Sequence, residues 1–237
     1  MKLILKTLLA TLLCLIIPTL VFAGSSRPKL TDQQIVRLKE VTSRIIKKSM
    51  PSLDNEVNNR SRKYKLKFHT IKSSKYFLES NFTIGRFFFG VPKYRIGVNP
   101  IIFEKEINDL ALEGVLVHEL VHSRDYYNGS TIRSIIPIGL KVSRKKSRAQ
   151  YERKTDLQTI MLGYGSGLLA YKAFQYPLLN EKELKTKRRE YLTPEEIKFI
   201  ISIKDNHPGL IKKWLKSKIP VNLEKFKEEF ENFKKSQ

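Results

Sequence analysis

The chain has 237 residues, of which 45 are lysine or arginine and 23 are aspartate or glutamate, so its formal net charge is +22. Hydrophobic residues make up 41% of the sequence and charged residues 29%. This balance is too apolar for a disordered chain and too charged for a protein with several membrane spans. The length is sufficient for one sizeable core but not clearly for two, so we expect a single globular domain.

Residues 1–23 have the pattern of a secretory signal peptide. Two lysines flank the start of an apolar run at residues 8–21, and a small-x-Ala cleavage site ends at Ala23. We therefore expect a mature domain of residues 24–237 with a net charge of +20, whereas an uncleaved leader would remain as an N-terminal anchor. Cleavage also removes Cys14, the only cysteine, and the lack of disulfides favours a bacterial protein that is periplasmic or secreted. No later segment of the sequence predicts a membrane span.

The mature chain begins with a predicted amphipathic helix. Residues 31–34 have the capping-box pattern, and apolar residues then recur at helical spacing as far as about Met50. Farther along the chain, apolar and polar residues alternate with a period of two at residues 64–68 and 94–98. This alternation is typical of half-buried strands, so we expect a strand in each of these two segments.

Two short apolar runs lie between these strands, at residues 76–78 and 87–89. Three or four strands are therefore expected to form one sheet over residues 64–99, and Pro100 ends the last of them. The apolar period changes from 2 to 3.6 near Pro100, which predicts an α+β fold. We expect a small twisted mixed sheet packed on the helix that follows it, with a helical C-terminal region.

A helix of about twenty residues is predicted from Ile107, and Asn128-Gly129 has the pattern of a left-handed C-cap at its end. The later segments are a basic loop at 141–148, a helix at about 149–161, a basic link at 185–189, a helix that starts at 193–196 and a final amphipathic helix at about 223–233. The helix from Ile107 carries the residues on which the functional interpretation depends.

Residues 118–122 read His-Glu-Leu-Val-His, which is the pattern HExxH. Side chains four residues apart on a helix lie within about 40° of each other on one face. His118 and His122 can therefore both reach a single metal ion, and zinc accepts such a pair of imidazole ligands. Glu119 is turned toward the space where a water at the metal would lie, which is the place of a general base.

The alternative is an ordinary surface patch of two histidines and a glutamate, with no metal. Apolar residues at 116–117 and 120–121 leave little of this helix polar, so His118 and His122 are expected to be partly buried. A neutral buried histidine needs a partner for its ring nitrogens, and a metal ion provides one.

A catalytic zinc ion needs a third protein ligand and one open position. The best candidate downstream of the HExxH pattern is Glu152, because its helix places Asp156 one turn later on the same face. Asp156 would accept a hydrogen bond from a ligand histidine and so fix its tautomer. The alternative for this pair is a solvated helix face beside basic residues, since ExxxD by itself is common.

Together, HExxH at 118–122 and ExxxD at 152–156 resemble the patterns of gluzincin-type zincin metallopeptidases. The resemblance implies a zincin-like fold with Zn²⁺ as the cofactor. It also implies His118, His122 and Glu152 as zinc ligands, Glu119 as the general base and Asp156 as the partner of a ligand histidine. Residues 151–171 are in addition similar to uncharacterised exported bacterial zincin-like proteins.

In a site of this type, zinc acidifies a water molecule and polarises the carbonyl group that the water attacks. Glu119 would take the proton from the water and then pass it to the leaving nitrogen. The resemblance thus implies an exported zinc metallopeptidase or amide hydrolase, whose substrate is a peptide or a cell-wall amide. Since a ligand histidine must be neutral, zinc affinity is expected to fall below about pH 6.5.

Some gluzincins add a downstream histidine or tyrosine that donates to the oxyanion. The candidates for this donor are Tyr126, Tyr127, Tyr164 and His207. Tyr164, beside two glycines, is favoured over His207, which has the setting of a helix-entry residue. The resemblance also implies a substrate strand antiparallel to residues 94–98, with Gly97 allowing a close backbone approach.

The basic residues are spread along the chain, which is typical of a solvated surface, although such a field attracts anionic envelope surfaces or polymers. The sequence contains no nucleic-acid-binding motif, so we expect no specific nucleic-acid partner. The alternative function is a non-catalytic basic protein that holds an anionic envelope component on the same fold. Glu119 favours the enzyme, because a protein that only binds needs no base beside its ligand histidines.

Overall fold

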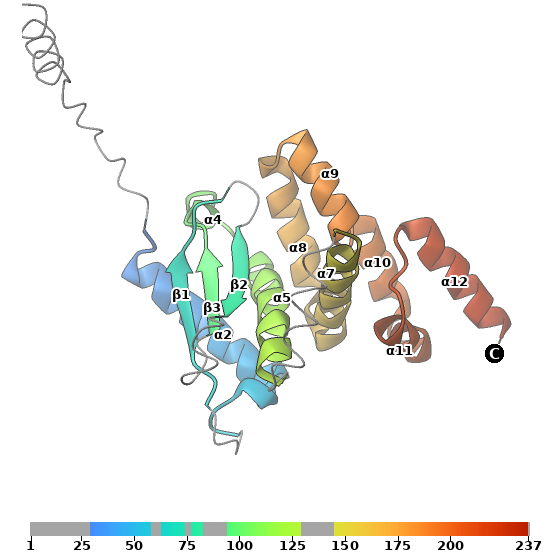
Figure 1. The fold of residues 1–237 in the computed structure, drawn as a ribbon, viewed down its shortest axis with the longest axis horizontal. Coiled ribbons are helices and arrows are strands. Elements are labelled where there is room, and N and C mark those ends of the chain that lie inside the picture. Colours follow the sequence, from blue (N-terminus) through green and yellow to red (C-terminus); the bar gives the residue numbers. More distant parts are fainter. Residues whose placement is uncertain (1–28, 58–62, 74–76, 83–93, 129–144, 237) are drawn as a thin grey trace, which may run out of the picture.

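The structure, a computed structural model, shows an α+β chain with a small mixed sheet and many helices (Figure 1). It describes residues 29–57, 63–73, 77–82, 94–128 and 145–236. The expected signal peptide, the expected strand at 87–89, the glycine of the expected C-cap at 129 and the start of the basic loop at 141–144 lie outside the described residues. Among the described residues, no helix combines the length and apolar character that a membrane span requires.

Helix α2 (Asp32–Ser49) is the predicted N-terminal helix, and its capping box is confirmed. The Thr31 hydroxyl accepts a hydrogen bond from the Gln34 backbone N–H at 3.2 Å, and the Gln34 side chain accepts one from the Thr31 N–H at 3.0 Å. These bonds satisfy two of the backbone donors that a helix start leaves free. The helix ends at a short 3-10 turn, Pro51–Leu53, and buries its apolar face in the first of two hydrophobic cores.

The sheet has three described strands, β1 (Leu66–Thr70), β2 (Leu78–Phe82) and β3 (Tyr94–Val98), in the order β1-β3-β2. Strand β3 is parallel to β1 and antiparallel to β2, so the predicted mixed sheet is confirmed. Strand β3 is therefore the central strand, with partners on both edges.

This arrangement shows that the expected substrate strand beside residues 94–98 is wrong, because both edges of β3 are already hydrogen bonded to other strands. Gly97 has a packing role instead. A Cβ atom at this position would overlap the Ile71 side chain and press on the ring of His69.

After a short helix α4 (Ile101–Glu104), helix α5 (Asp109–Asn128) runs for 20 residues between the sheet and the later helices (Figure 1). Most of α5 is buried, because it packs on β2 on one side and on α8 (Gly165–Gln175) on another. The backbones of α5 and α8 are in direct contact where Gly114 meets Gly167, and a Cβ atom on either glycine would overlap the other helix. Two glycines therefore set the close approach of these helices.

Helix α7 (Lys145–Thr159) leads through a π-helical turn (Ile160–Tyr164) to α8. The turn changes direction at Gly163, whose φ of 92° favours glycine. The predicted helix at 149–161 is thus present, but it starts earlier: residues 145–148, expected in a basic loop, are helical.

Helix α9 (Glu181–Glu190) replaces the predicted basic link at 185–189. That prediction was wrong because Asn180 and Glu183 form a capping box that starts a helix just before the basic run. The basic residues at 185–189 therefore lie on both faces of α9, with Lys187 buried and Lys185 exposed.

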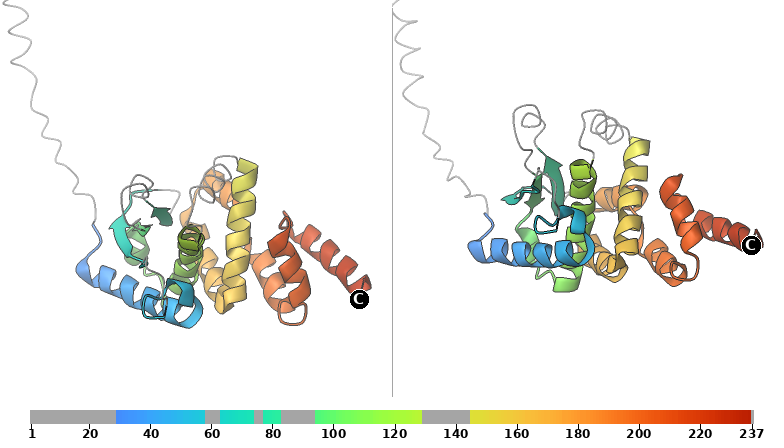
Figure 2. Two further views of the ribbon diagram at one scale, coloured as in Figure 1. Left: turned by 60° about the horizontal axis from the view of Figure 1, so that its bottom comes forward. Right: turned by 90° about the horizontal axis from the view of Figure 1, so that it is seen from below.

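The C-terminal region is helical, as predicted. It comprises a 3-10 turn at Tyr176–Leu178 and then α10 (Pro194–Ile203), α11 (Pro208–Lys216) and α12 (Leu223–Lys235). These last three helices lie at the end of the molecule away from the sheet (Figure 2). They form a second hydrophobic core with parts of α7 and α8, centred on Trp214 and Phe226. Helix α8 contributes Tyr171 to the first core and Leu168 to the second, so it joins a core built on the sheet to one built on helices.

Candidate metal centre

Helices α5 and α7 bring three polar side chains together at the boundary between the two cores. Nε2 of His118 lies 3.2 Å from Nε2 of His122 and 3.3 Å from Oε2 of Glu152, and Nε2 of His122 lies 3.2 Å from the same Glu152 oxygen. The two histidines are only 5% and 6% exposed. The structure thus gathers the three predicted ligands into one buried, nearly equilateral triangle of ligand atoms.

The spacing of this triangle fits a metal ion. A tetrahedral ion with bonds of about 2.0 Å holds its ligand atoms about 3.3 Å apart, which is the separation along all three sides of the triangle. Imidazole nitrogens and carboxylate oxygens carry the lone pairs that bind metal ions. A cation placed there would satisfy all three side chains, so this group can hold a metal ion.

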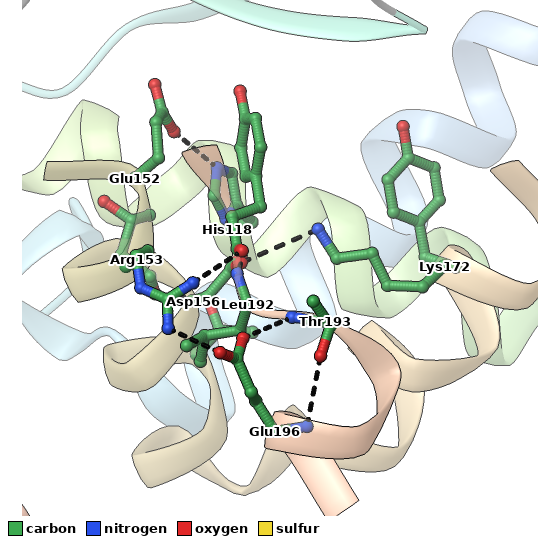
Figure 3. Close-up of polar contacts among 12 residues, drawn as sticks. His118, Glu152, Arg153, Asp156, Lys172, Leu192, Thr193 and Glu196 are labelled. Carbon is green, nitrogen blue, oxygen red and sulfur yellow. Dashed lines mark hydrogen bonds and ion pairs between the residues drawn. The ribbon is translucent and has the colours of Figure 1, made fainter. Parts of the chain in front are cut away.

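Asp156 lies one turn beyond Glu152 on α7 and contacts the far side of the His118 ring (Figure 3). Its Oδ1 is 2.8 Å from Nδ1 of His118, and its Oδ2 accepts a hydrogen bond from the backbone N–H of Leu192 at 2.9 Å. Lys172 places its ammonium group 3.6 Å from Oδ2. Burial would raise the pKa of Asp156, but Lys172 and His118 lower it below its ordinary value. Asp156 is therefore an ionised carboxylate that holds the His118 ring with Nε2 toward the ligand triangle.

The position of α7 is fixed by its buried residue Arg153 (Figure 3). The guanidinium donates to Oε1 of Glu196 on α10 at 2.8 Å and to the carbonyl oxygens of Tyr191 and Pro220. A buried guanidinium is stable only when its donors are satisfied in this way. Arg153 thus anchors the turn of α7 that presents Glu152 to the histidines.

His118 and Glu152 shift each other's pKa in opposite directions. Burial lowers the pKa of His118, but the Asp156 and Glu152 carboxylates more than offset this and raise it to about 10. Burial raises the pKa of Glu152, but the two histidines bring it below its ordinary range. Without a metal, His118 is therefore protonated at neutral pH, and a metal ion must displace that proton.

Glu119 points from α5 toward a small cavity next to the triangle. Its side chain is buried, and burial raises its pKa, against the opposing effect of His118 and His122. The cavity has a volume of about 30 Å³ and is lined by His118, Glu119, Lys187 and Tyr191, among others. This volume is large enough for one water molecule. A buried carboxylate with a raised pKa next to the ligand triangle is a candidate general base.

The structure does not bring the two favoured oxyanion-donor candidates to the triangle. The hydroxyl group of Tyr164 lies 3.3 Å from Oγ of Ser49 at the end of α2. His207 precedes α11 and packs its ring against Phe230 at 4.9 Å, in the second core.

The two remaining tyrosine candidates lie on α5 itself. Tyr127 belongs to an aromatic cluster with Tyr64 and Tyr94 in the first core. Tyr126 lies one helical turn beyond His122, and its hydroxyl group interacts with that of Tyr151, whose ring is 5.0 Å from the His122 ring.

Sequence reasoning missed the aromatic and cationic side chains that surround the ligands. The Tyr191 ring lies 5.8 Å from the ring of His118. Lys172 and Lys187 both place their ammonium groups over the Tyr191 ring, at 4.6 and 4.5 Å from its centroid. The Asn180-x-x-Glu183 capping pattern is the signal that could have predicted a helix at the basic run, and with it a buried face that includes Lys187.

Comparisons with models of protein families, with curated proteins and with solved structures find no match to this chain. A proposal for the function therefore depends on the geometry of the candidate metal centre.

Proposed function

We propose that this protein is a zinc-dependent metallopeptidase or amide hydrolase with a zincin-like arrangement of its site. The observation that carries the proposal is the triangle of His118, His122 and Glu152, whose three sides of 3.2 to 3.3 Å match tetrahedral coordination. Two imidazoles and one carboxylate form a donor set of hydrolytic zinc enzymes, which use three protein ligands and leave the fourth position open. Zinc fits these borderline ligands better than magnesium or calcium, which prefer oxygen atoms alone.

A zinc ion bound here would supply a Lewis acid and would acidify a water molecule. Every other part of the reaction falls to side chains of this chain. Glu119 takes a proton from the attacking water and returns it to the leaving nitrogen, and its raised pKa brings it closer to the range in which it can do both. Asp156 keeps His118 in the orientation that directs Nε2 to the ion.

An extended substrate needs a free sheet edge near the metal centre. Strand β3 has none, but β2 is an edge strand of the described sheet and lies against α5. The hydroxyl groups of Ser80 on β2 and Ser123 on α5 are 3.1 Å apart, and Leu78 lines the cavity beside Glu119. We therefore place the substrate along β2 instead of residues 94–98.

The substrate class and the location of the protein belong to the same proposal. The leader pattern at residues 1–23 supports export, to the bacterial periplasm or beyond the cell, where the substrates are peptides or cell-wall amides. The basic surface supports residence near an anionic envelope component.

The test of this proposal compares the zinc-loaded protein with its Glu119→Gln variant on a library of peptides and peptidoglycan fragments. The parent should cleave at least one substrate, and Glu119→Gln should retain zinc and lose on the order of 10² to 10⁴-fold in rate. Glu113→Gln is the matched control, because Glu113 lies on α5 but pairs with Arg44 on the outer side of the helix. Equal behaviour of the parent and Glu119→Gln across the library would favour the non-catalytic basic binding protein instead.

A further inference from the structure

A buried lysine faces the cavity beside Glu119. Lys187 lies on α9, is only 7% exposed, and lines the same cavity as His118 and Glu119. Lysine is among the residues least often buried, so this position requires a physical reason. Burial and the charge of Lys172 lower the pKa of Lys187 to about 8, while Glu152, Glu119 and Glu190 act in the opposite direction and favour its charged form.

The second lysine of the cavity has a different environment. Lys172 comes from α8 and lies 3.6 Å from Oδ2 of Asp156, the carboxylate that holds His118. Its charge therefore belongs to the support of a metal ligand. Lys187 comes from another helix. Its pKa is raised by the carboxylates of Glu152, the proposed ligand, and Glu119, the proposed base. The two ammonium groups lie at similar distances from the Tyr191 ring, whose centroid is 5.8 Å from that of the His118 ring.

The charges around the cavity favour an additional negative group. The charged side chains that line the cavity are Glu119, Asp156, Lys172 and Lys187, and the ligand triangle beside it adds the Glu152 carboxylate. These five groups carry a single net negative charge, which a divalent ion would convert into a single net positive charge. The low dielectric constant of a buried site makes the electrostatic energy of such an unbalanced charge large. A negatively charged oxygen atom would neutralise it.

The cavity volume limits what this negative group can be. About 30 Å³ accommodates one water-sized oxygen atom but not a whole carboxylate or phosphate group. In amide hydrolysis, a single oxygen atom becomes negative when the water attacks, namely the oxygen of the scissile carbonyl. The volume therefore fits this single oxygen atom.

We propose that Lys187 is the oxyanion donor of this site, with its protonated amine directed at the carbonyl oxygen of the substrate. This inference rests on the proposed hydrolase. The water oxygen bonds to the carbonyl carbon, its proton goes to Glu119, and the π-electron pair moves to the carbonyl oxygen, which accepts a hydrogen bond from the Lys187 ammonium group. When the pair returns, the carbon–nitrogen bond breaks and the nitrogen takes the proton from Glu119. Lys187 keeps its proton throughout and takes the place that sequence reasoning assigned to Tyr164 or His207.

The test replaces Lys187 by Met, which keeps the length of the side chain and removes the charge. Lys187→Gln is a second variant, because it retains hydrogen-bond donors and so separates loss of charge from loss of hydrogen bonding. Lys185→Met is the matched control, since Lys185 lies on the same helix and is exposed. Zinc content and melting temperature are measured for each variant, followed by kcat and KM on a substrate that the parent cleaves. Binding of methylphosphonate, which can place one anionic oxygen atom in the cavity while the rest of the molecule stays outside it, is measured by calorimetry on the zinc-loaded proteins.

Both Lys187 variants should bind zinc like the parent, lose about 10² to 10³-fold in kcat with little change in KM, and bind methylphosphonate at least tenfold more weakly. Lys185→Met should match the parent in every measurement. If the parent cleaves substrate and both Lys187 variants retain its kcat and its methylphosphonate affinity, or if the parent does not bind methylphosphonate, the oxyanion role is wrong while the hydrolase stands. If methylphosphonate binding depends on Lys187 but the parent cleaves no substrate, the hydrolase is wrong and an anion site remains.

Discussion

Asp156 contacts His118 with its Oδ1 atom 2.8 Å from the ring nitrogen Nδ1, on the side of the ring opposite the ligand triangle. The aspartate is itself held by the backbone N–H of Leu192 and by Lys172, so it is fixed before any metal binds. This relationship directs the Nε2 atom of His118 toward Glu152 and His122, the other two members of the candidate ligand triangle.

The first prediction concerns this contact. Asp156→Asn should weaken zinc binding about 10 to 100-fold, because the neutral amide no longer favours the required His118 tautomer. Zinc content at saturating metal should stay at about one ion per chain, and a chelator competition titration measures the change in affinity. The melting temperature should fall as well, because Lys172 loses its ion-pair partner. Asp205→Asn is the control, since the Asp205 side chain is 81% exposed and pairs with its neighbour Lys204. An unchanged zinc affinity in Asp156→Asn would contradict the orienting role.

The second prediction concerns pH. The pKa of metal-free His118 is about 10, so at every pH below this value a zinc ion must displace a proton from its ring. Zinc affinity should therefore rise up to tenfold per pH unit from pH 6 to pH 8, instead of levelling off above about 6.5 as the ordinary histidine pKa predicts. Calorimetry in buffers of different ionisation enthalpy should detect about one proton released per zinc bound at pH 7. Affinity that is constant above pH 6.5 would show that His118 is already neutral there.

The raised pKa of His118 also makes the stability of the metal-free protein depend on pH. A histidine whose pKa is raised on folding contributes stability that is fully present below its unfolded pKa of about 6.5 and is lost as pH rises through the folded value. The melting temperature of the metal-free protein should thus lose a contribution from His118 between pH 6.5 and about 10. His118→Ala should lack this contribution, so the gap between parent and variant should narrow as pH rises. A difference in melting temperature between parent and variant that grows with pH would contradict the raised pKa of His118.

The third prediction concerns the junction of the two cores. Gly114→Ala should destabilise the protein by about 1 to 3 kcal/mol, because the added methyl group overlaps the backbone of α8 at Gly167. Denaturant unfolding of the metal-free protein measures this change. Gly209→Ala on α11 is the control, since a Cβ atom there meets only the end of Phe233 at an ordinary 3.4 Å. A similar free energy of unfolding for both variants would mean that the two helices can move apart without cost.

Local patterns in the sequence predicted a large part of this fold. The capping boxes at Thr31 and Thr193 predicted the starts of α2 and α10, and alternation predicted β3 at residues 94–98. The ligand triangle was also accessible, because the spacing of His118 and His122 is fixed by one helix, and only Glu152 had to come from elsewhere. These features depend on residues within a few turns of each other.

What the sequence did not predict depends on contacts between distant segments. Nothing local indicates that β2 and β1 both pair with β3, which leaves no free edge beside Gly97. The basic run at 185–189 shows charge but not which lysine turns inward, since that is decided by how α9 packs on α7. Tyr164 was proposed for its place between glycines, but the π-helical turn directs its hydroxyl group toward Ser49. Each of these positions follows from tertiary packing, which overrides local pattern.

The most direct test of the account is the coordination of zinc in the purified protein. Elemental analysis combined with X-ray absorption spectroscopy should find about one zinc ion per chain, with two imidazole nitrogens and one carboxylate oxygen at about 2.0 to 2.2 Å. The double variant His118→Ala, His122→Ala should contain no zinc after the same treatment, and Glu152→Ala should bind it more weakly than the parent. A double variant that retains one zinc ion per chain, or a spectrum without histidine ligands, would contradict the metal centre.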